Sequence, residues 1–195
     1  MDIALFDFDG TITHKDSLAD FIQFAVGKPA YYLGLLQLSP ILVAYKLKLI
    51  SNHRSKEMLI SHFFRGWDAD RFQATADKYS SEHLAEIVRH NAMQQINWHI
   101  SQGHEVVIIS ASMESWLKAW CEQHGLALIA TRLEINSNTL SGKFATPNCH
   151  GEEKLNRILQ EYDLSSYDAI YAYGDSDGDK QILDIADIKY YKHFH

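Results

Sequence analysis

Two carboxylates, one residue apart, follow the first apolar run of the chain. The stretch ALFDFDGTIT (residues 4–13) leads from strand-like residues into Asp7 and Asp9. A carboxylate can attack phosphorus and form an aspartyl phosphate, which splits ester hydrolysis into two easier displacements. A second carboxylate nearby can protonate the leaving alcohol and later deprotonate the attacking water. We therefore predict that Asp7 is a nucleophile and that Asp9, with the flexible Gly10 after it, moves protons.

Other polar side chains follow later apolar runs. Ser110 comes after VVII, Asp175 and Asp179 lie in GDSDGD (174–179) after IYAY, and Lys154 lies near the start of the helical pattern GEEKLNRIL. Ligands bind at the carboxyl ends of parallel strands, so these residues are expected to converge on one crevice. Several carboxylates around one lysine require a hard cation, and oxygen-only ligands indicate Mg²⁺. Lys154 and Ser110 are then available to contact a phosphoryl group.

The elements that must position these residues alternate along the chain. Short β-branched or aromatic runs without polar alternation predict parallel strands that are covered on both faces. Helical patterns lie between them, two of which end at Gly103 and Gly125. This alternation predicts an α/β fold, an open parallel Rossmann-like sheet with helices on both faces. The expected strands are 3–6, 105–110, 126–130 and 169–174, and the expected helices are 92–102, 113–124 and 152–162.

A long interval without strand patterns separates the first expected strand from the second. Residues 17–90 contain only helix-like segments, which predicts a helical cap inserted after the first strand. Residues 1–16 and 91–195 would then form the catalytic core. A cap that closes over the crevice would exclude water and select a small substrate. Within 126–146, alternating residues around Asn136-Ser137-Asn138 predict a β-hairpin appended to the sheet.

The stretch from residue 29 to 50 is the most apolar part of the cap. It carries no charge from Ala30 to Tyr45, but it is slightly short of the roughly 20 apolar residues that a spanning helix needs. Gln37, Ser39 and Pro40 interrupt its middle. We therefore predict a broken helical pair buried in the helical subdomain, with Pro40 starting the second helix, in preference to membrane contact.

Composition limits the class of protein. The 195 residues are 46% hydrophobic and carry a formal net charge of −7. No basic block is present, which argues against a nucleic-acid-binding surface. Cys121 and Cys149 form no metal-binding or disulfide pattern, and the N-terminus lacks the basic start and apolar run of a secretory signal. A cytoplasmic protein is the expectation.

The motifs and their order resemble the haloacid dehalogenase (HAD) superfamily of phosphatases. DFDGT at 7–11, Ser110 after an apolar strand, Lys154 at the start of a later helix and GDSDGD at 174–179 match its four motifs along the whole chain. The helical insertion and the contexts SAS and GDSDGDKQIL resemble the phosphoserine phosphatase-like subgroup, subfamily IB. One departure is SAS, because phosphoserine phosphatases often carry glycines after this serine.

The resemblance implies a role for each matching residue. Asp7 would be the nucleophile and a Mg²⁺ ligand, and Asp9 would be the acid/base whose backbone carbonyl also contacts the metal. Asp175 would be a further metal ligand, and Asp179 either a ligand or an acid behind the ligands. Ser110 and Lys154 would contact phosphate, and Thr11 would belong to the same phosphate site and support its loop.

Substrate selection is less constrained by the motifs. Asp16 lies where the phosphoserine enzymes have a Glu that meets the substrate ammonium, so an amine-bearing phosphate, including phosphoserine, is a candidate substrate. Arg54 or Arg65 in the cap would meet a substrate carboxylate through a bidentate fork. The acid at position 9 is typical of phosphatases and mutases in the superfamily and is absent from its dehalogenases.

Three functions remain open from the sequence. The first is a Mg²⁺-dependent phosphatase that hydrolyses a small phosphomonoester through an aspartyl phosphate. The second is a phosphotransferase or mutase that passes the phosphoryl group from the same intermediate to another acceptor. The third is a non-catalytic Mg²⁺-binding protein that engages a membrane or partner through residues 29–50.

Overall fold

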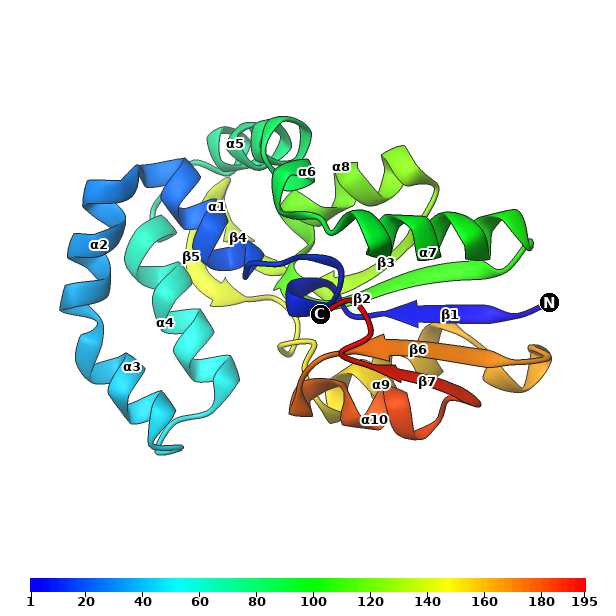
Figure 1. Ribbon diagram of the computed structural model, residues 1–195. Helices are drawn as coiled ribbons and strands as arrows, with labels where there is room; N and C mark the ends of the chain where they lie inside the picture. The colour runs from blue at the N-terminus through cyan, green and yellow to red at the C-terminus, as the bar shows by residue number, and fades with distance from the viewer.

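The structure, a computed structural model that describes residues 1–195, is built on a five-stranded parallel sheet (Figure 1). The first strand is central, with Phe6 paired to Ile108 on one side and to Tyr173 on the other. The predicted α/β fold class is confirmed, although the edge strand β7 was not predicted. In spatial order the strands are β3 (Ala127–Thr131), β2 (Glu105–Met113), β1 (Ile3–Phe6), β6 (Ile170–Gly174) and β7 (Ile188–Tyr191).

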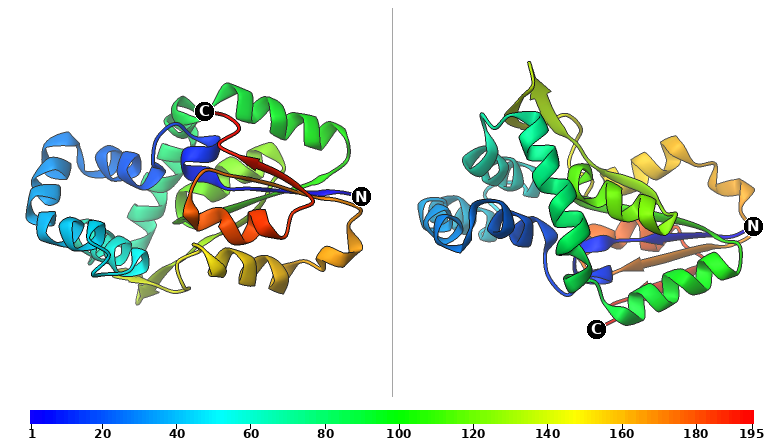
Figure 2. Two further views of the ribbon diagram at one scale, coloured as in Figure 1. Left: turned by 60° about the horizontal axis from the view of Figure 1, so that its bottom comes forward. Right: turned by 90° about the horizontal axis from the view of Figure 1, so that it is seen from above.

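Helices cover both faces of this sheet. In Figures 1 and 2, α7 (His90–Ser101) and α8 (Glu114–His124) lie on one face, and α9 (Glu152–Glu161) and α10 (Lys180–Asp184) lie on the other. Successive side chains of a strand point to opposite faces. Accordingly, Ala4 and Phe6 of β1 belong to one buried cluster, while Ile3 and Leu5 belong to the second. The whole of β1 is therefore buried and holds the residues that follow it in place.

All of the chain between β1 and β2 is helical, apart from its connections. The segments that lead into and out of this region run side by side, because Thr13 and Val88 form an antiparallel bridge and Arg89 N–H donates to the Ile12 carbonyl. The predicted boundaries of the cap lie beside this neck, and we keep the division into core and cap as a proposal. The helices are α1 (Ser17–Val26), α2 (Lys28–Gln37), α3 (Ser39–Lys46), α4 (Asn52–Phe64), α5 (Ala69–Glu82) and α6 (Leu84–Ile87).

The helices α2 and α3 are the broken pair predicted from residues 29–50, and Pro40 lies in the first turn of α3 as expected. The prediction that the pair is buried was wrong. Helix α2 buries only Tyr31 and Gly34, and α3 buries no residue. The pair lies at the outer edge of the molecule, so other helices cover only one of its sides (Figure 1). No helix of the structure has both the length and the apolar character to cross a membrane.

The predicted hairpin is present, but it is not part of the main sheet. Strands β4 (Leu133–Asn136) and β5 (Thr139–Phe144) form a separate two-stranded sheet. Their connection is a two-residue turn in which Ser137 and Asn138 both have positive φ, as a tight hairpin turn requires. The hairpin packs instead on α4, where a side chain at Gly142 would collide with Ser61. Close backbone contact with the cap therefore draws the hairpin away from the sheet edge.

A buried histidine of α7 that has no role in the predicted catalysis packs against Phe6 of β1. His99 of α7 is fully buried, with Nε2 3.0 Å from the Tyr173 hydroxyl and Nδ1 2.9 Å from Nδ1 of His104. Burial, together with the neighbouring His104, lowers the pKa of His99 to about 4. The native state therefore binds this proton only near pH 4, whereas an unfolded histidine binds it near pH 6.5.

This difference predicts that acid weakens the fold. The stabilisation from neutral His99 is complete above pH 6.5 and is lost as the pH falls towards 4, to a limit of about 3 kcal/mol. Urea unfolding between pH 7 and pH 4.5 will show the loss, and His99→Gln will make the pH dependence shallower. His90→Gln, an exposed histidine of the same helix, is the control and will leave the slope unchanged. Equal slopes for wild type and His99→Gln would contradict the prediction.

Candidate active site

The loop after β1 carries the two catalytic candidates. Asp7 extends the strand, because its N–H donates to the Tyr173 carbonyl of β6 at 3.0 Å. The chain then turns at Asp9 and Gly10, and Gly10 has a φ of 87°. A side chain at Gly10 would collide with the carboxylate of Asp175, which follows β6. Glycine therefore serves two needs here, the left-handed turn and the close approach of a third acid.

The carboxylate of Asp7 is held by a buried lysine from α9, on the sheet face that α9 and α10 cover. Lys154, in the first turn of α9, is 2% exposed and donates to Asp7 Oδ1 at 2.5 Å and to Asp179 Oδ1 at 2.7 Å. Burial raises the pKa of Asp7 and the charge of Asp179 adds to this rise, while Lys154 opposes it. Although the pKa of Asp7 is raised overall, to about 7, the lysine favours the charged form of this nearly inaccessible carboxylate.

Asp179 uses its remaining oxygen to shape the loop after β6. Its Oδ2 accepts hydrogen bonds from the backbone N–H groups of Asp175 and Ser176 and from the Ser176 hydroxyl. Although burial opposes it, the lysine lowers the pKa of Asp179. Both oxygens of Asp179 are therefore engaged with the protein, and this favours the prediction of an acid behind the metal ligands over that of a direct ligand.

Asp9 lies in different surroundings, although it is only two residues from Asp7. Its Oδ2 accepts from the Ser112 hydroxyl at 2.5 Å, and its Oδ1 accepts from the backbone N–H of Ser17 at 2.6 Å. Burial raises the pKa of Asp9, and the charge of Asp16 adds to this effect. A carboxyl group with a raised pKa is suited to donate a proton. The two acids thus differ in their partners: a lysine holds Asp7, whereas a hydroxyl and a backbone amide hold Asp9.

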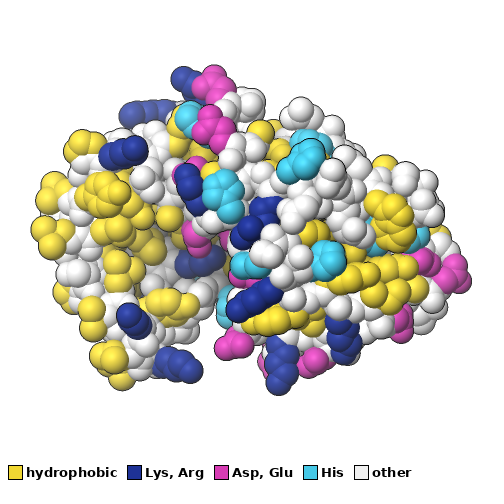
Figure 3. All heavy atoms as spheres, viewed as in Figure 1, with side chains coloured by type: hydrophobic (Ala, Val, Ile, Leu, Met, Phe, Trp, Pro, Cys, Tyr) yellow, Lys and Arg dark blue, Asp and Glu magenta, His cyan; other side chains and the backbone are white.

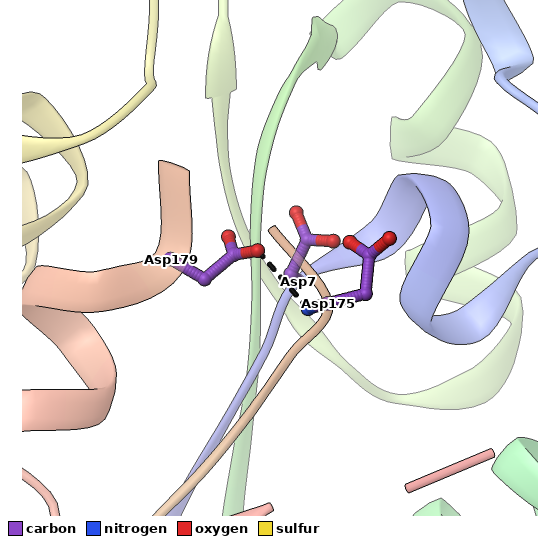
Figure 4. A group of neighbouring side chains, drawn as sticks. All are labelled: Asp7, Asp175 and Asp179. Carbon is purple, nitrogen blue, oxygen red and sulfur yellow. Dashed lines mark hydrogen bonds between the residues drawn. The ribbon is translucent and has the colours of Figure 1, made fainter. Parts of the chain in front are cut away.

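Three carboxylates lie close together after the ends of β1 and β6. Figure 4 shows Asp7 between Asp175 and Asp179, and oxygens of all three lie within 4.8 Å of one another. Asp7 Oδ2 is buried without a hydrogen-bond partner. An unpartnered carboxylate oxygen is costly inside a protein unless a cation or substrate contacts it. The oxygen-only donor set and this free atom fit Mg²⁺.

Two of the predicted phosphate contacts, Lys154 and Ser110, lie beside the catalytic acids. Ser110 and Thr11 are both buried, and the Ser110 hydroxyl lies 3.5 Å from Asp9 Oδ2. Thr11 Oγ1 has no partner. The hydroxyl that stabilises the loop is instead that of Thr13, which accepts from Gly10 N–H at 3.2 Å and donates to the Lys15 carbonyl. The Thr11 hydroxyl thus remains without a partner inside the protein.

The cap residues predicted to select the substrate fall in two places. Asp16 caps α1 and lines a cavity of about 420 Å³ that also contains Lys56. Arg54 and Arg65 line another cavity of about 640 Å³, between α4 and the hairpin. Arg54 is exposed and pairs with Glu57 at 3.1 Å. The structure thus brings Asp16 towards the catalytic acids and places the two arginines in a separate cavity.

Two residues near the site were missed by sequence analysis. Ser112 follows Ser110 by two positions on β2, so the strand periodicity placed both on one side and could have identified it. Lys56, on α4, donates to the Ala111 carbonyl at 3.3 Å and lowers the pKa of Asp9, in opposition to burial and Asp16. No local pattern distinguishes Lys56 from a surface lysine, because only the docking of the cap brings it to the site.

Comparison with known proteins agrees with this geometry. The family model of the haloacid dehalogenase-like hydrolases matches residues 4–184, which include the acids, the serine and the lysine described above. The chain belongs to this family. The resemblance predicted from the four motifs is therefore confirmed, and with it the expectation of a hydrolase.

Individual relatives extend along almost the whole chain. Protein CicA of Caulobacter vibrioides is 29% identical over 194 residues, which are 98% of this chain and 86% of that protein. A protein of unknown function from Bordetella pertussis has a similar structure, with a TM-score of 0.82, 20% identity and coverage of 96% and 88% of the two chains. A substrate-bound phosphoserine phosphatase has a TM-score of 0.69, 15% identity and coverage of 97% and 84%. The fold of this family member thus resembles that of phosphoserine phosphatases.

Proposed function

We propose that this family member is a Mg²⁺-dependent phosphatase that hydrolyses a small phosphomonoester through an aspartyl phosphate on Asp7. The contrast between the surroundings of Asp7 and Asp9 carries the proposal. Asp7 has a lysine on one oxygen and no partner on the other, as a nucleophile requires. Asp9 has a raised pKa and lies on the same loop. The phosphoserine phosphatase-like fold supports the same activity.

In the first step, a carboxylate oxygen of Asp7 attacks phosphorus and the bond from phosphorus to the alcohol oxygen breaks. The proton of Asp9 goes to that oxygen, and the alcohol leaves. In the second step, water attacks the phosphorus of the aspartyl phosphate and gives its proton to Asp9. Inorganic phosphate leaves and Asp7 is restored. Ser110, Thr11 and Lys154 would contact the phosphoryl oxygens.

Mg²⁺ would be held by Asp7, Asp175 and the backbone carbonyl of Asp9, and when bound it neutralises negative charge on the transferring phosphoryl group. Asp179 would act behind these ligands by holding Lys154 and the loop that carries Asp175. The cap would close over a small ester and exclude water. A cytoplasmic location, and the absence of a nucleic-acid partner, stay predictions.

Phosphate release from a panel of small esters tests this function. The panel includes phosphoserine and p-nitrophenyl phosphate, each with EDTA and with Mg²⁺ restored. We expect turnover with Mg²⁺ and a loss of about 100-fold or more without it. Products formed with added alcohols distinguish hydrolysis from transfer to another acceptor. Turnover that is unchanged by EDTA would overturn the metal dependence, and transfer to the alcohols in preference to water would favour a phosphotransferase.

The proton-transfer role of Asp9 predicts an effect that depends on the leaving group. Asp9→Asn will slow the hydrolysis of alkyl esters such as phosphoserine by about 10³-fold, because an alkoxide needs a proton to leave. The first step with p-nitrophenyl phosphate will be affected much less, because its phenolate leaves without a proton. Rapid-quench measurement of the p-nitrophenolate burst checks this difference. Equal losses of the first step on both esters would contradict the role.

A further inference from the structure

The largest concentration of exposed apolar side chains lies on the cap. In Figure 3, apolar side chains gather at the end of the molecule formed by α2, α3 and the residues after them, with backbone and other atoms between them. Monomeric proteins rarely expose contiguous apolar patches of this kind unless something binds there. We call this set the cap patch; its members are Tyr32, Leu33, Leu36, Val43, Tyr45, Leu47 and Leu49, which are 40–73% exposed.

The charge of this segment is opposite to that of the rest of the molecule. Residues 28–50 contain Lys28, Lys46 and Lys48, all exposed, and no acidic residue. The whole chain nevertheless has a net charge of −7. Apolar side chains flanked by lysines are typical of protein segments that lie on an anionic lipid surface. Such contact requires no membrane-spanning helix.

The cavity that contains Asp16 lies under the cap patch. It has a volume of about 420 Å³ and lies between α1, α2, α3 and α4. Such a volume is in the range of cavities that hold small organic ligands. Its walls are mainly apolar, and Tyr45 belongs both to this cavity and to the cap patch. Its apolar lining residues are Leu18, Ala19, Ile22, Tyr31, Leu35, Leu42, Tyr45 and Leu59.

One end of the cavity lies near the catalytic loop, because Ser17, the neighbour of Asp16 in the chain, donates its backbone N–H to Asp9 Oδ1 at 2.6 Å. Asp16 and Lys56 line this end of the cavity. Lys56 also donates to the carbonyl of Ala111, next to Ser110. These contacts place the cavity beside the loop of Asp9, so the leaving group of a phosphomonoester at Asp7 could extend into it.

We propose that the substrate is a phosphomonoester of an alcohol that carries an acyl chain, and that the cap patch takes it from the surface of an anionic bilayer. The acyl chain enters the cavity between α1 and α4, the phosphate reaches Asp7, and the three lysines contact lipid headgroups. This inference rests on the proposed phosphatase activity and names the class of its substrate. It differs from the expectation that residues 29–50 are buried without membrane contact.

The first test is a series of monomeric esters that share one headgroup. Glycerol 3-phosphate is compared with its hexanoyl and lauroyl esters below their micelle concentrations, with p-nitrophenyl phosphate as a reference. We expect kcat/KM to rise about fourfold for each methylene that the cavity buries. Leu42→Asn, in the cavity wall, will flatten the series. Ile135→Asn, an exposed apolar residue of the hairpin, is the matched control and will not.

The second test is co-sedimentation with vesicles. We expect the protein to pellet with vesicles of equal phosphatidylcholine and phosphatidylglycerol. Lys46→Gln with Lys48→Gln will lower partitioning by about 25-fold, and Lys118→Gln with Lys189→Gln is the charge-matched control. Combined Leu36→Gln, Leu47→Gln and Leu49→Gln will abolish pelleting. Circular dichroism confirms that these variants remain folded.

The outcomes separate this inference from the proposed function. Turnover of p-nitrophenyl phosphate with a flat chain-length series overturns the inference alone. A rising series without pelleting also overturns it, and would indicate that the acylated phosphomonoester is taken from solution. A dimer that the three leucine substitutions dissociate, without vesicle binding by the wild type, would assign the cap patch to a second copy. Absence of turnover on every ester overturns the proposed function and this inference with it.

Discussion

Asp7→Asn will lower phosphate release from every phosphomonoester by about 10⁴-fold or more while the protein remains folded. The amide cannot attack phosphorus, so no aspartyl phosphate forms. The fold tolerates the change because Lys154 still pairs with Asp179. Removing one of three neighbouring carboxylate charges also reduces the repulsion among them. Asp7 Oδ2 is the only fully buried carboxylate oxygen without a hydrogen-bond partner.

Acid-quenched labelling with a ³²P ester measures the intermediate directly. Wild type will retain label that neutral hydroxylamine removes, and Asp7→Asn will retain none. Asp177→Asn is the matched control, because Asp177 is an exposed acid in the loop after β6. It will keep turnover within about twofold of wild type. Label on Asp7→Asn, or residual turnover above about one per cent, would refute Asp7 as nucleophile.

Lys154→Met will impair both stability and catalysis. Without the ammonium group, Asp7 and Asp179 become buried acids with no cationic side chain beside them. Removing one partner of a buried ion pair costs about 3–5 kcal/mol, which urea unfolding will show as a lower midpoint. Turnover will fall by about 10³-fold, since the phosphoryl charge also loses its lysine.

Two comparisons make this prediction specific. Lys180→Met removes an exposed lysine at the start of α10 and will change the free energy of unfolding by less than about 0.5 kcal/mol. Mg²⁺ will raise the unfolding midpoint of Lys154→Met more than that of wild type, because the variant has no other positive group between its acids. Unchanged stability of Lys154→Met would show that the ion pairs contribute no net stabilisation.

Elements with a clear local sequence pattern that are also fully buried could be predicted from the sequence. The strand Ile3–Phe6 was predicted at its observed bounds, because four apolar residues followed by Asp7 leave little choice for a strand buried on both faces. Strand β7 was missed because it is short, lies at the sheet edge and is only half-buried. Its alternating sequence IKYY carries a weak signal.

Local sequence patterns could not predict features that depend on packing between segments distant in the sequence. The charge of Lys56 acts on Asp9 only because α4 packs near β2, where Lys56 donates to the Ala111 carbonyl. The exposure of α2 and α3 was mispredicted because an uncharged stretch was assumed to be interior. Hydrophobic residues can also cover a surface, and composition alone does not distinguish the two.

The attachment of the hairpin to α4 constrains how the active site opens. Backbone hydrogen bonds join Gly66 and Trp67 to Leu140, and Ala69 to Asn138. A cap connected only at its neck would pivot on two segments of chain, but here the hairpin must travel with it. We therefore expect any opening to move the cap helices and the hairpin together, with bending at the neck and at the base of the hairpin. Amide exchange in α4 and β5 should consequently slow together when a ligand closes the site, as one cooperative unit.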